Sequence, residues 1–233
     1  MNLIKQHIPT GHPNRPGTKL EALLAIIFHY TANDRISATD TMNARYFARD
    51  WHLGETQELK GQPCEWVMKV LHDDEGVIMP VRVEVPFGYG SAQIIADEDS
   101  ITEAMPPDET AWAAGDRRLP WEEKFRGQQP AATYIFERRQ NYRSVSIEIC
   151  NNASWQKACK NASDWAVEFL REKKLKVNLE KSLNPNSEDS KPADGEILLL
   201  RHYDLTGKIC PKPMVNSSQE WETFILRIAN QVN

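Results

Sequence analysis

The first apolar run of the chain predicts a buried strand that ends at a polar edge. Residues 25–30 read Ala-Ile-Ile-Phe-His-Tyr, so polar groups replace apolar ones only at the last two positions. Residues 37–51 follow with apolar positions on one helical stripe, and they predict a helix. The strand therefore brings His29 to the edge of a sheet.

The middle of the chain predicts four shorter strands. Apolar positions alternate on both sides of the acidic, glycine-ended segment 73–76, which is the pattern of a β-hairpin over residues 66–85. Residues 91–96 and 101–104 predict two more strands that are joined by a polar turn. We therefore expect a hairpin in this region and two further strands after it.

A carboxylate interrupts the next predicted strand. Residues 145–150 alternate so that the apolar side chains share one face, while Glu148 lies on the other face at mid-strand. A charged group in that place requires a polar or functional surrounding. Residues 197–200 form another apolar run, and this run leads directly into His202.

Two longer helices and a loop complete the pattern. Residues 155–175 carry apolar side chains at helical spacing after Ser154, a residue type that caps helices well. A last helix is predicted to begin at Ser217, where Glu220 completes a capping-box pattern. The polar stretch 184–195 is predicted to be a loop. Strands and helices alternate along the chain, which predicts an α/β fold.

The composition excludes several classes of protein. The 233 residues are 40% hydrophobic and 26% charged, which excludes a polytopic membrane protein and a disordered chain. Lys and Arg number 28 and Asp and Glu number 33, so the net charge is −5, and no basic stripe indicates a nucleic-acid partner. The apolar run at residues 20–28 contains Glu21 and is too short to span a bilayer. We therefore expect neither nucleic-acid binding nor membrane insertion.

The cysteines and the first residues bear on where the protein is made. The four cysteines, at positions 64, 150, 159 and 210, do not form the dense framework of a small secreted domain, so we expect them to be reduced. Residues 1–17 contain three prolines and two histidines where a signal peptide would have its apolar region. We expect synthesis in the cytoplasm without a signal peptide.

Three residues offer the ligands that zinc prefers. His29 lies at the end of the first predicted strand, and His202 and Cys210 lie eight residues apart on a glycine-containing loop. Three such ligands leave a fourth coordination position open, as in catalytic zinc sites. Each residue also has a structural interpretation, His29 as a hydrogen-bonded core histidine and Cys210 as an inert buried thiol. Spacing alone does not decide between the two interpretations.

The segments that carry these residues resemble a known enzyme family. Residues 28–33 and 201–211, together with 15–17 and 146–151, are similar to segments of the zinc-dependent N-acetylmuramoyl-L-alanine amidases. These are the phage and prophage endolysins whose fold is related to that of peptidoglycan recognition proteins. The resemblance covers nearly the whole chain, and it is most specific in the stretch that contains His202 and Cys210.

The resemblance implies a fold and a set of site residues. It implies one catalytic domain over residues 1–233, with a central mixed β-sheet flanked by helices and an extra β-hairpin inserted at 57–86. The site residues that it implies are His29, His202 and Cys210 as ligands of a zinc ion, and Glu148 and Lys208 as the catalytic pair.

The chemistry of the implied reaction agrees with these roles. Cleavage of the amide bond between N-acetylmuramic acid and L-alanine requires an activated water, and zinc lowers the pKa of its bound water to about 7. Glu148 can take a proton from that water and pass it to the leaving nitrogen. Lys208 can donate to the oxyanion. The alternative for Glu148 is a strand carboxylate paired with Arg143 or with a helix, and the alternative for Lys208 is a solvated loop lysine.

The chain departs from the family's pattern at three positions. Many relatives carry a histidine where this chain has Gln93 or Ala113, and related phage enzymes place a catalytic tyrosine where it has Ala92. None of these is an expected ligand, so the zinc site is unaffected, and Glu148 is left to carry the proton transfer alone. Asp204 is the one nearby competitor as a ligand, and its offset of two from the histidine disfavours it.

The resemblance also implies a substrate and a setting. We expect a monomer that binds peptidoglycan and acts in cell-wall lysis after holin-type release or lysis. The few residues after Cys210 suffice for the last helix only, so a separate wall-binding domain is either absent or removed from this sequence. One alternative is a non-catalytic peptidoglycan-binding module of the same fold, against which the retained Cys210 argues. The other is a cysteine hydrolase with Cys210 as nucleophile and His202 as base. The remaining three cysteines lack ligand spacing, and we expect them to be packing residues.

Overall fold

The computed structural model describes residues 2–12, 14–48, 90–115 and 130–233, and the backbone of the strands at 56–59, 62–72 and 78–86. The chain divides into two compact units, one formed by Met1–Ala48 with Gly90–Asn233 and the other by Arg49–Tyr89. The assignment of residues 1–233 to one catalytic domain stays a prediction. None of the described helices has the length and apolar content needed to cross a bilayer.

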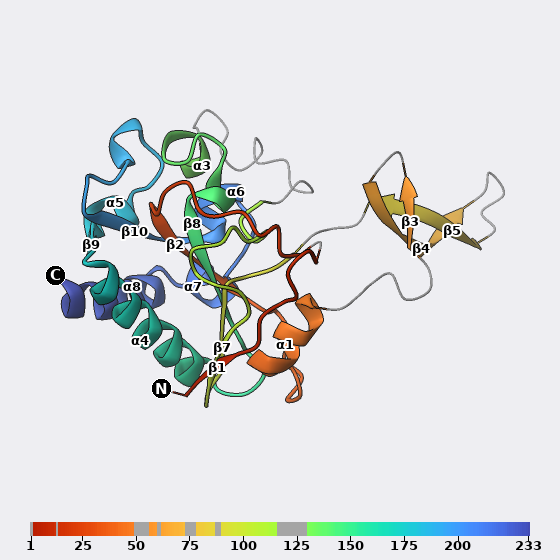
Figure 1. Cartoon of the computed structure of the whole chain (residues 1–233), viewed down its shortest axis with the longest axis horizontal. Helices are drawn as coiled ribbons and strands as arrows, with labels where there is room; N and C mark the ends of the chain where they lie inside the picture. Colours follow the sequence, from red (N-terminus) through yellow and green to blue (C-terminus); the bar gives the residue numbers. More distant parts are fainter. Residues whose placement is uncertain are drawn as a thin grey trace. The chain divides into compact units, whose positions relative to one another are not determined.

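A seven-stranded sheet forms the centre of the larger unit (Figure 1). Its order is β1-β7-β6-β8-β2-β10-β9, and every neighbouring pair is parallel except β6 with β7. The strands are β1 (Leu3–Lys5), β2 (Ala25–Tyr30), β6 (Ile94–Ala96), β7 (Ile101–Glu103), β8 (Ser144–Ile149), β9 (Lys176–Val177) and β10 (Glu196–Arg201). The predicted mixed sheet of an α/β fold is confirmed.

Helices cover both faces of this sheet, because β2 and β10 bury apolar side chains on both faces. On one face α4 (Trp155–Lys173) and α8 (Ser218–Val232) pack together over the strands. On the other face lie α3 (Ala131–Tyr134) and α6 (His202–Thr206). The remaining helices are α1 (Asp40–Phe47), α5 (Leu179–Leu183), α7 (Lys212–Asn216) and the 3₁₀ turns Gln140–Tyr142 and Glu188–Ser190. The two faces therefore have separate apolar cores.

The predicted helix caps are confirmed, with one change of partner. The hydroxyl groups of Ser154 and Ser217 accept the backbone N–H groups of Lys157 and Glu220, at the starts of α4 and α8. The Glu220 carboxylate accepts a hydrogen bond from Trp155 Nε1, so it joins the two helices at their first turns instead of completing a capping box. The predicted capping box is wrong because a residue on a neighbouring helix provides the better donor.

The helix predicted at 37–51 is shorter than expected at its start. Thr39 is the N-cap residue, because its hydroxyl accepts the N–H of Met42, and α1 therefore begins at Asp40. It ends at Phe47, and residues 49–51 lie outside the described residues. The strand predicted at 91–96 begins only at Ile94. At the preceding position the side-chain oxygen of Gln93 accepts the N–H of Ser146 on β8, where a strand would use a backbone carbonyl.

The smaller unit is a three-stranded antiparallel sheet. Its strands are β3 (Thr56–Leu59), β4 (Gln62–His72) and β5 (Ile78–Pro86), in that order. The register of β4 with β5 is antiparallel and places Trp66 opposite Glu84. The acidic segment 73–76 lies outside the described residues. The hairpin is confirmed, and β3 is an addition that the sequence pattern did not indicate.

One asparagine ties together the two places where the larger unit is interrupted. Asn14 Nδ2 donates to the carbonyl oxygen of Phe47 at 2.9 Å, and the N–H of Gly90 donates to Asn14 Oδ1 at 3.2 Å. Asn14 is only 4% exposed, so both bonds are shielded from water. The chain therefore leaves the larger unit and returns to it within reach of a single side chain.

We predict that residues 49–89 can be replaced by a short glycine-serine linker without loss of the larger unit. The loop to be closed is short because Asn14 holds its two ends together, and closure entropy changes slowly with length. Circular dichroism and thermal melting should give a folded protein with a melting temperature close to that of the full chain. Asn14→Ala in the shortened chain should lower it, and an unfolded shortened chain would contradict the prediction.

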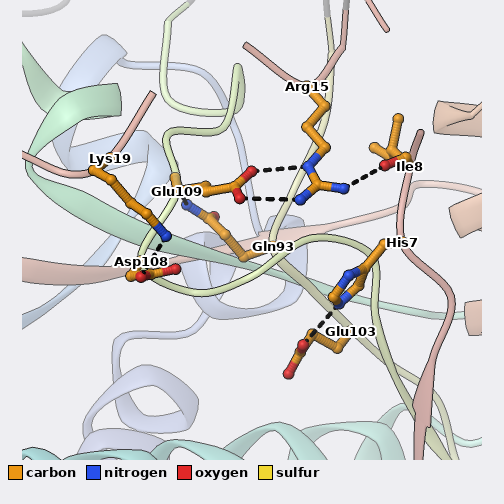
Figure 2. A network of polar contacts seen from close by, with 8 residues as sticks. All are labelled: His7, Ile8, Arg15, Lys19, Gln93, Glu103, Asp108 and Glu109. Atoms are coloured by element: carbon orange, nitrogen blue, oxygen red, sulfur yellow. Dashed lines mark hydrogen bonds and ion pairs between the residues drawn. The ribbon is translucent and has the colours of Figure 1, made fainter. Parts of the chain in front are cut away.

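A buried ion pair attaches the N-terminal segment to the segment after β7 (Figure 2). Arg15 donates from Nε and Nη2 to the two oxygens of Glu109 at 2.8 and 3.0 Å, and from Nη1 to the carbonyl oxygen of Ile8 at 2.8 Å. The two side chains are only 11% and 10% exposed. The neighbouring pair of Lys19 with Asp108 is exposed on both sides. Arg15 is therefore the main polar link between these segments.

We predict that Arg15→Met destabilises the protein by about 3–5 kcal/mol near neutral pH, since it leaves a buried carboxylate without its partner. Arg15 holds the pKa of Glu109 below its usual value, so the pair stabilises the fold above that range and loses its effect as pH falls through the folded-state pKa. The difference from the native chain should therefore shrink in acid.

Urea unfolding at neutral and acidic pH tests this. Lys19→Met is the matched control, because the exposed pair of Lys19 with Asp108 should contribute about 0–1 kcal/mol. An Arg15→Met variant as stable as the Lys19→Met variant would show that the buried pair does not anchor the segment.

Candidate active site

Three parallel strands bring the predicted site residues to one edge of the sheet. In the register of β2 with β8, His29 lies directly opposite Glu148. Side chains of register partners on neighbouring strands point to the same face, and this is the face that carries the apolar core below α3 and α6. His202 follows β10, the other neighbour of β2, and is the first residue of α6.

A chain reversal after α6 returns Cys210 to the same place. Gly207 ends the helix in the left-handed conformation, with φ of 77°, which a residue without a Cβ adopts at no steric cost. The N–H of Tyr203 then donates to the carbonyl oxygen of Cys210 at 3.0 Å. The thiol is thereby held next to the first turn of the helix that His202 begins.

His29, His202 and Cys210 form a compact set of metal-ligating atoms. The Nδ1 atoms of the two histidines are 3.1 Å apart, the Cys210 sulfur lies 3.9 Å from His29 Nδ1, and all ligand atoms are within 4.8 Å of one another. Usual zinc bond lengths in a tetrahedron place two nitrogens about 3.3 Å apart and a nitrogen about 3.6 Å from a sulfur. The observed spacing therefore fits an ion of this kind.

The protonation states of these residues also suit a metal. Burial lowers the pKa of His29 well below its usual value, and the neighbouring His202 and Lys208 lower it further, so the imidazole is neutral and can ligate. Burial raises the pKa of Cys210 to about 12, against the N–H of Tyr30, which donates to the sulfur. A thiolate in this place needs a cation next to it. The neutral imidazole of His29, the imidazole of His202 and the buried thiol of Cys210 are nitrogen and sulfur donors of the kind that zinc prefers.

The charges of Glu148 and Lys208 influence the pKa values of residues in this cluster. The Oε2 atom of Glu148 is buried and has no hydrogen-bond partner among the described residues. Burial raises the pKa of Glu148 to about 7, and the positive charge of Lys208 opposes that rise. Lys208 also influences the pKa values of His29 and Cys210. The carboxylate and the ammonium group therefore both act on the space around the ligands.

The structural alternative for Glu148 is not formed. Arg143, the partner that this alternative requires, makes ion pairs with Glu21 at 3.5 Å and with Glu137 at 3.3 Å. A buried carboxylate oxygen that lacks a partner is costly unless a ligand or a reacting group satisfies it. Glu148 thus has the burial and the position of a functional residue.

Asp204 is not a fourth ligand. Its carboxylate accepts the backbone N–H of Arg201 at 2.8 Å and also binds the guanidinium group of that residue at 2.8 and 3.2 Å. These bonds hold the first turn of α6 and leave the carboxylate outside the metal-ligating set. Within the part of the chain that the structure describes, His29, His202 and Cys210 are the one group of three or more such residues close enough to share an ion.

The positions at which the chain departs from the family's pattern have structural roles. Gln93 is fully buried, donates from Nε2 to the carbonyl oxygen of Glu109 at 2.7 Å and accepts the N–H of Ser146 at Oε1. Ala92 is fully buried in the core. Ala113 is partly buried. Neither Gln93 nor Ala92 is exposed at the surface of the site.

Two of the other cysteines are packing residues, as predicted. Cys150 is buried against Ala44 and Ile95, and Cys159 is partly buried against the core below α4. Burial raises the pKa of both thiols. Cys64 lies on β4, for which the structure describes the backbone only.

The chain is similar to several known proteins. Residues 20–213 match the family model described as N-acetylmuramoyl-L-alanine amidase. The chain is 21% identical over 227 residues to the N-acetylmuramoyl-L-alanine amidase CwlL of Bacillus licheniformis, and 24% identical over 225 residues to BlyA of Bacillus subtilis (strain 168). The match covers 96% and 95% of this chain but 46% and 45% of those proteins, so the chain spans about half the length of the curated relatives.

A solved structure shares the fold. The catalytic domain of XlyA superposes with a TM-score of 0.58 and 22% sequence identity, over 98% of this chain and 99% of that one. The agreement over nearly both whole chains confirms the predicted architecture, a central sheet flanked by helices.

Proposed function

Since the chain belongs to the N-acetylmuramoyl-L-alanine amidase family, we propose that it is a zinc-dependent hydrolase of the amide bond between N-acetylmuramic acid and L-alanine in peptidoglycan. One observation carries the proposal. Two histidines and a cysteine converge at one sheet edge, on the face where a buried carboxylate oxygen without a partner also lies.

The metal would be held by His29, His202 and Cys210, whose atoms have the spacing and the chemistry that zinc requires. A bound zinc ion supplies a water of lowered pKa and a positive charge that polarises the scissile carbonyl. The protein contributes buried surroundings, since the three ligands are 2%, 2% and 3% exposed. Burial strengthens every electrostatic interaction at the site.

Glu148 is the general base and acid in this proposal. Its unpartnered Oε2 atom is available to accept the proton of the attacking water and then to deliver it to the nitrogen of L-alanine. The register of β2 with β8 keeps the carboxylate at the level of His29, one strand away. Asp204, the other carboxylate considered, does not take part in the proposed site, because it is bound by Arg201.

Lys208 stabilises the oxyanion in this proposal. It lies two residues before Cys210 on the reversal after α6, and its charge lowers the pKa values of Glu148 and Cys210. An ammonium group there can donate to the carbonyl oxygen as negative charge develops on it.

The biological setting follows from the same proposal. We infer that the partner is the muramyl peptide of the wall, that the protein acts as a monomer, and that it reaches the wall after holin-type release or lysis, as a prophage or phage endolysin with bacteriolytic activity. The amidase names of CwlL and BlyA support the substrate class.

Observations at the site disfavour both alternatives. A cysteine hydrolase needs an accessible thiolate, whereas Cys210 is 3% exposed and burial raises the pKa of its thiol to about 12. A binding module without activity has no need of a buried, unpartnered carboxylate next to a complete ligand set. A chelator that abolishes activity would separate the zinc enzyme from the cysteine hydrolase.

We predict one zinc ion per chain, and strong loss of it in Cys210→Ser. A hydroxyl group is a poor replacement for a thiolate on zinc. Metal analysis after dialysis against a chelator measures the effect. Cys159→Ser is the matched control and should keep its zinc, because Cys159 lies on α4 and packs against the core on the opposite face of the sheet. Full zinc content in Cys210→Ser would show that Cys210 is not a zinc ligand.

We predict that Glu148→Gln keeps zinc and wall binding and lowers turnover about 10² to 10⁴-fold, because glutamine keeps the shape but cannot accept the proton. Lys208→Ala should keep zinc and lose about 10² to 10³ in rate. The double mutant should lose less than the product of the two losses, since both groups act on one transition state.

The assay is release of new L-alanine amino termini from purified walls, with zinc content measured on the same samples. Near-normal turnover in Glu148→Gln would overturn the mechanism. Loss of zinc from that variant would make Glu148 a ligand.

A further inference from the structure

A single buried hydroxyl group connects a proposed metal ligand to the proposed oxyanion donor. Thr206 is 7% exposed, and its Oγ1 atom donates to the carbonyl oxygen of His202 at 3.3 Å. The same oxygen accepts the backbone N–H of Lys208 at 3.3 Å. The hydroxyl therefore uses its donor and an acceptor position at once, between the first residue of α6 and the chain that leaves it.

The two bonds act on different segments. A threonine often donates to the carbonyl four residues earlier in a helix, and that bond belongs to the helix alone. The second is a local bond to the N–H two residues later, a pattern that threonine also makes. It reaches past Gly207 to Lys208, and it therefore ties the chain that leaves α6 to the helix.

The backbone of Lys208 is held mainly by the segment around it. Gly207 precedes it in the left-handed conformation, and glycine is the residue with the greatest conformational freedom. After it, the N–H of Cys210 donates to the carbonyl oxygen of Lys208 at 2.7 Å, which makes a tight turn over Ile209. Ile209 is 56% exposed and therefore packs weakly. The bond to Thr206 holds the backbone N–H of Lys208, which directly follows the flexible Gly207.

We propose that Thr206 is a positioning residue, whose hydroxyl group sets the direction of Lys208 relative to the metal ligands and thereby the rate of the amidase reaction. The inference rests on the proposed function. It requires that Thr206 act through Lys208 and contribute little to zinc binding, since its hydroxyl contacts only backbone groups in the bonds described.

The test compares Thr206→Val, which keeps the shape and removes the hydroxyl, with Thr206→Ser, which keeps the hydroxyl. Thr206→Val should lower kcat about 10 to 10²-fold with KM and zinc content unchanged, because a small misplacement of a catalytic group has effects of this size. Thr206→Ser should stay within about twofold of the native rate. Thr110→Val is the matched control, because Thr110 is fully buried and its hydroxyl has no partner among the described residues.

A second background shows whether Thr206 acts through Lys208. In a Lys208→Ala chain, Thr206→Val should have no further effect on kcat. An equal loss of rate in both backgrounds would overturn the proposal, and so would native turnover in Thr206→Val. Loss of zinc from Thr206→Val would also contradict the proposal, because it would show that the hydroxyl group supports the proposed ligand His202 and not Lys208.

A measurement that does not depend on activity separates this inference from the proposed function. Amide hydrogen exchange at Lys208 should be faster in Thr206→Val than in the native chain, and native-like in Thr206→Ser. If the native protein has no amidase activity, the proposed function fails, while the exchange rates still decide whether Thr206 holds Lys208. Unchanged exchange in Thr206→Val would overturn the inference whatever the activity.

Discussion

The parallel pairing of β2 with β8 sets His29 opposite Glu148, and the geometry of the whole site follows from that register. Side chains alternate along a strand, so a shift of one residue would turn Glu148 into the core below α4 and α8. The alternation on β8 prevents this, because Val145, Ile147 and Ile149 are fully buried in that core. Apolar packing on one face thus fixes the position of a carboxylate on the other.

Burial at this edge has an electrostatic consequence for the ligands. Desolvation keeps His29 neutral and Cys210 protonated, so the folded chain alone does not generate the thiolate. The N–H of Tyr30 and the charge of Lys208 favour the ionised sulfur, but burial outweighs them. In the proposed site a bound cation would supply the missing stabilisation, and metal binding would then be coupled to deprotonation of the thiol. Within the folded chain, the groups that favour the Cys210 thiolate are too weak to offset its burial, so the thiolate would require a bound cation.

Much of the fold and of the site could be predicted because the signals are local. The apolar run of β2, the alternation of β8 and the helical spacing of α4 are visible in short windows. The residue types at 29, 202 and 210 are compatible with zinc, but only the resemblance to the amidases favours a metal site over packing residues. The pairing of β1 with β7, nearly a hundred residues later, has no such signal. Neither has the bond from Trp155 to Glu220, which joins two helices that are distant in sequence. The role of the Thr206 hydroxyl depends on backbone direction after Gly207, and residue types alone do not show it.

Gln93 shows how a departure from the family's pattern can be structural. Pairing of β6 with β8 begins at Ile94 and Ile147, so the N–H of Ser146 has no strand partner on that side, and the side-chain oxygen of Gln93 provides one at 2.8 Å. The amide nitrogen of the same side chain binds the carbonyl oxygen of Glu109, whose carboxylate holds Arg15. Polar bonds thus run from the N-terminal segment to the strand that carries Glu148, two residues beyond Ser146. Substrate contact is therefore not needed to explain a polar residue at position 93, because the N–H of Ser146 on β8 already requires a hydrogen-bond acceptor there.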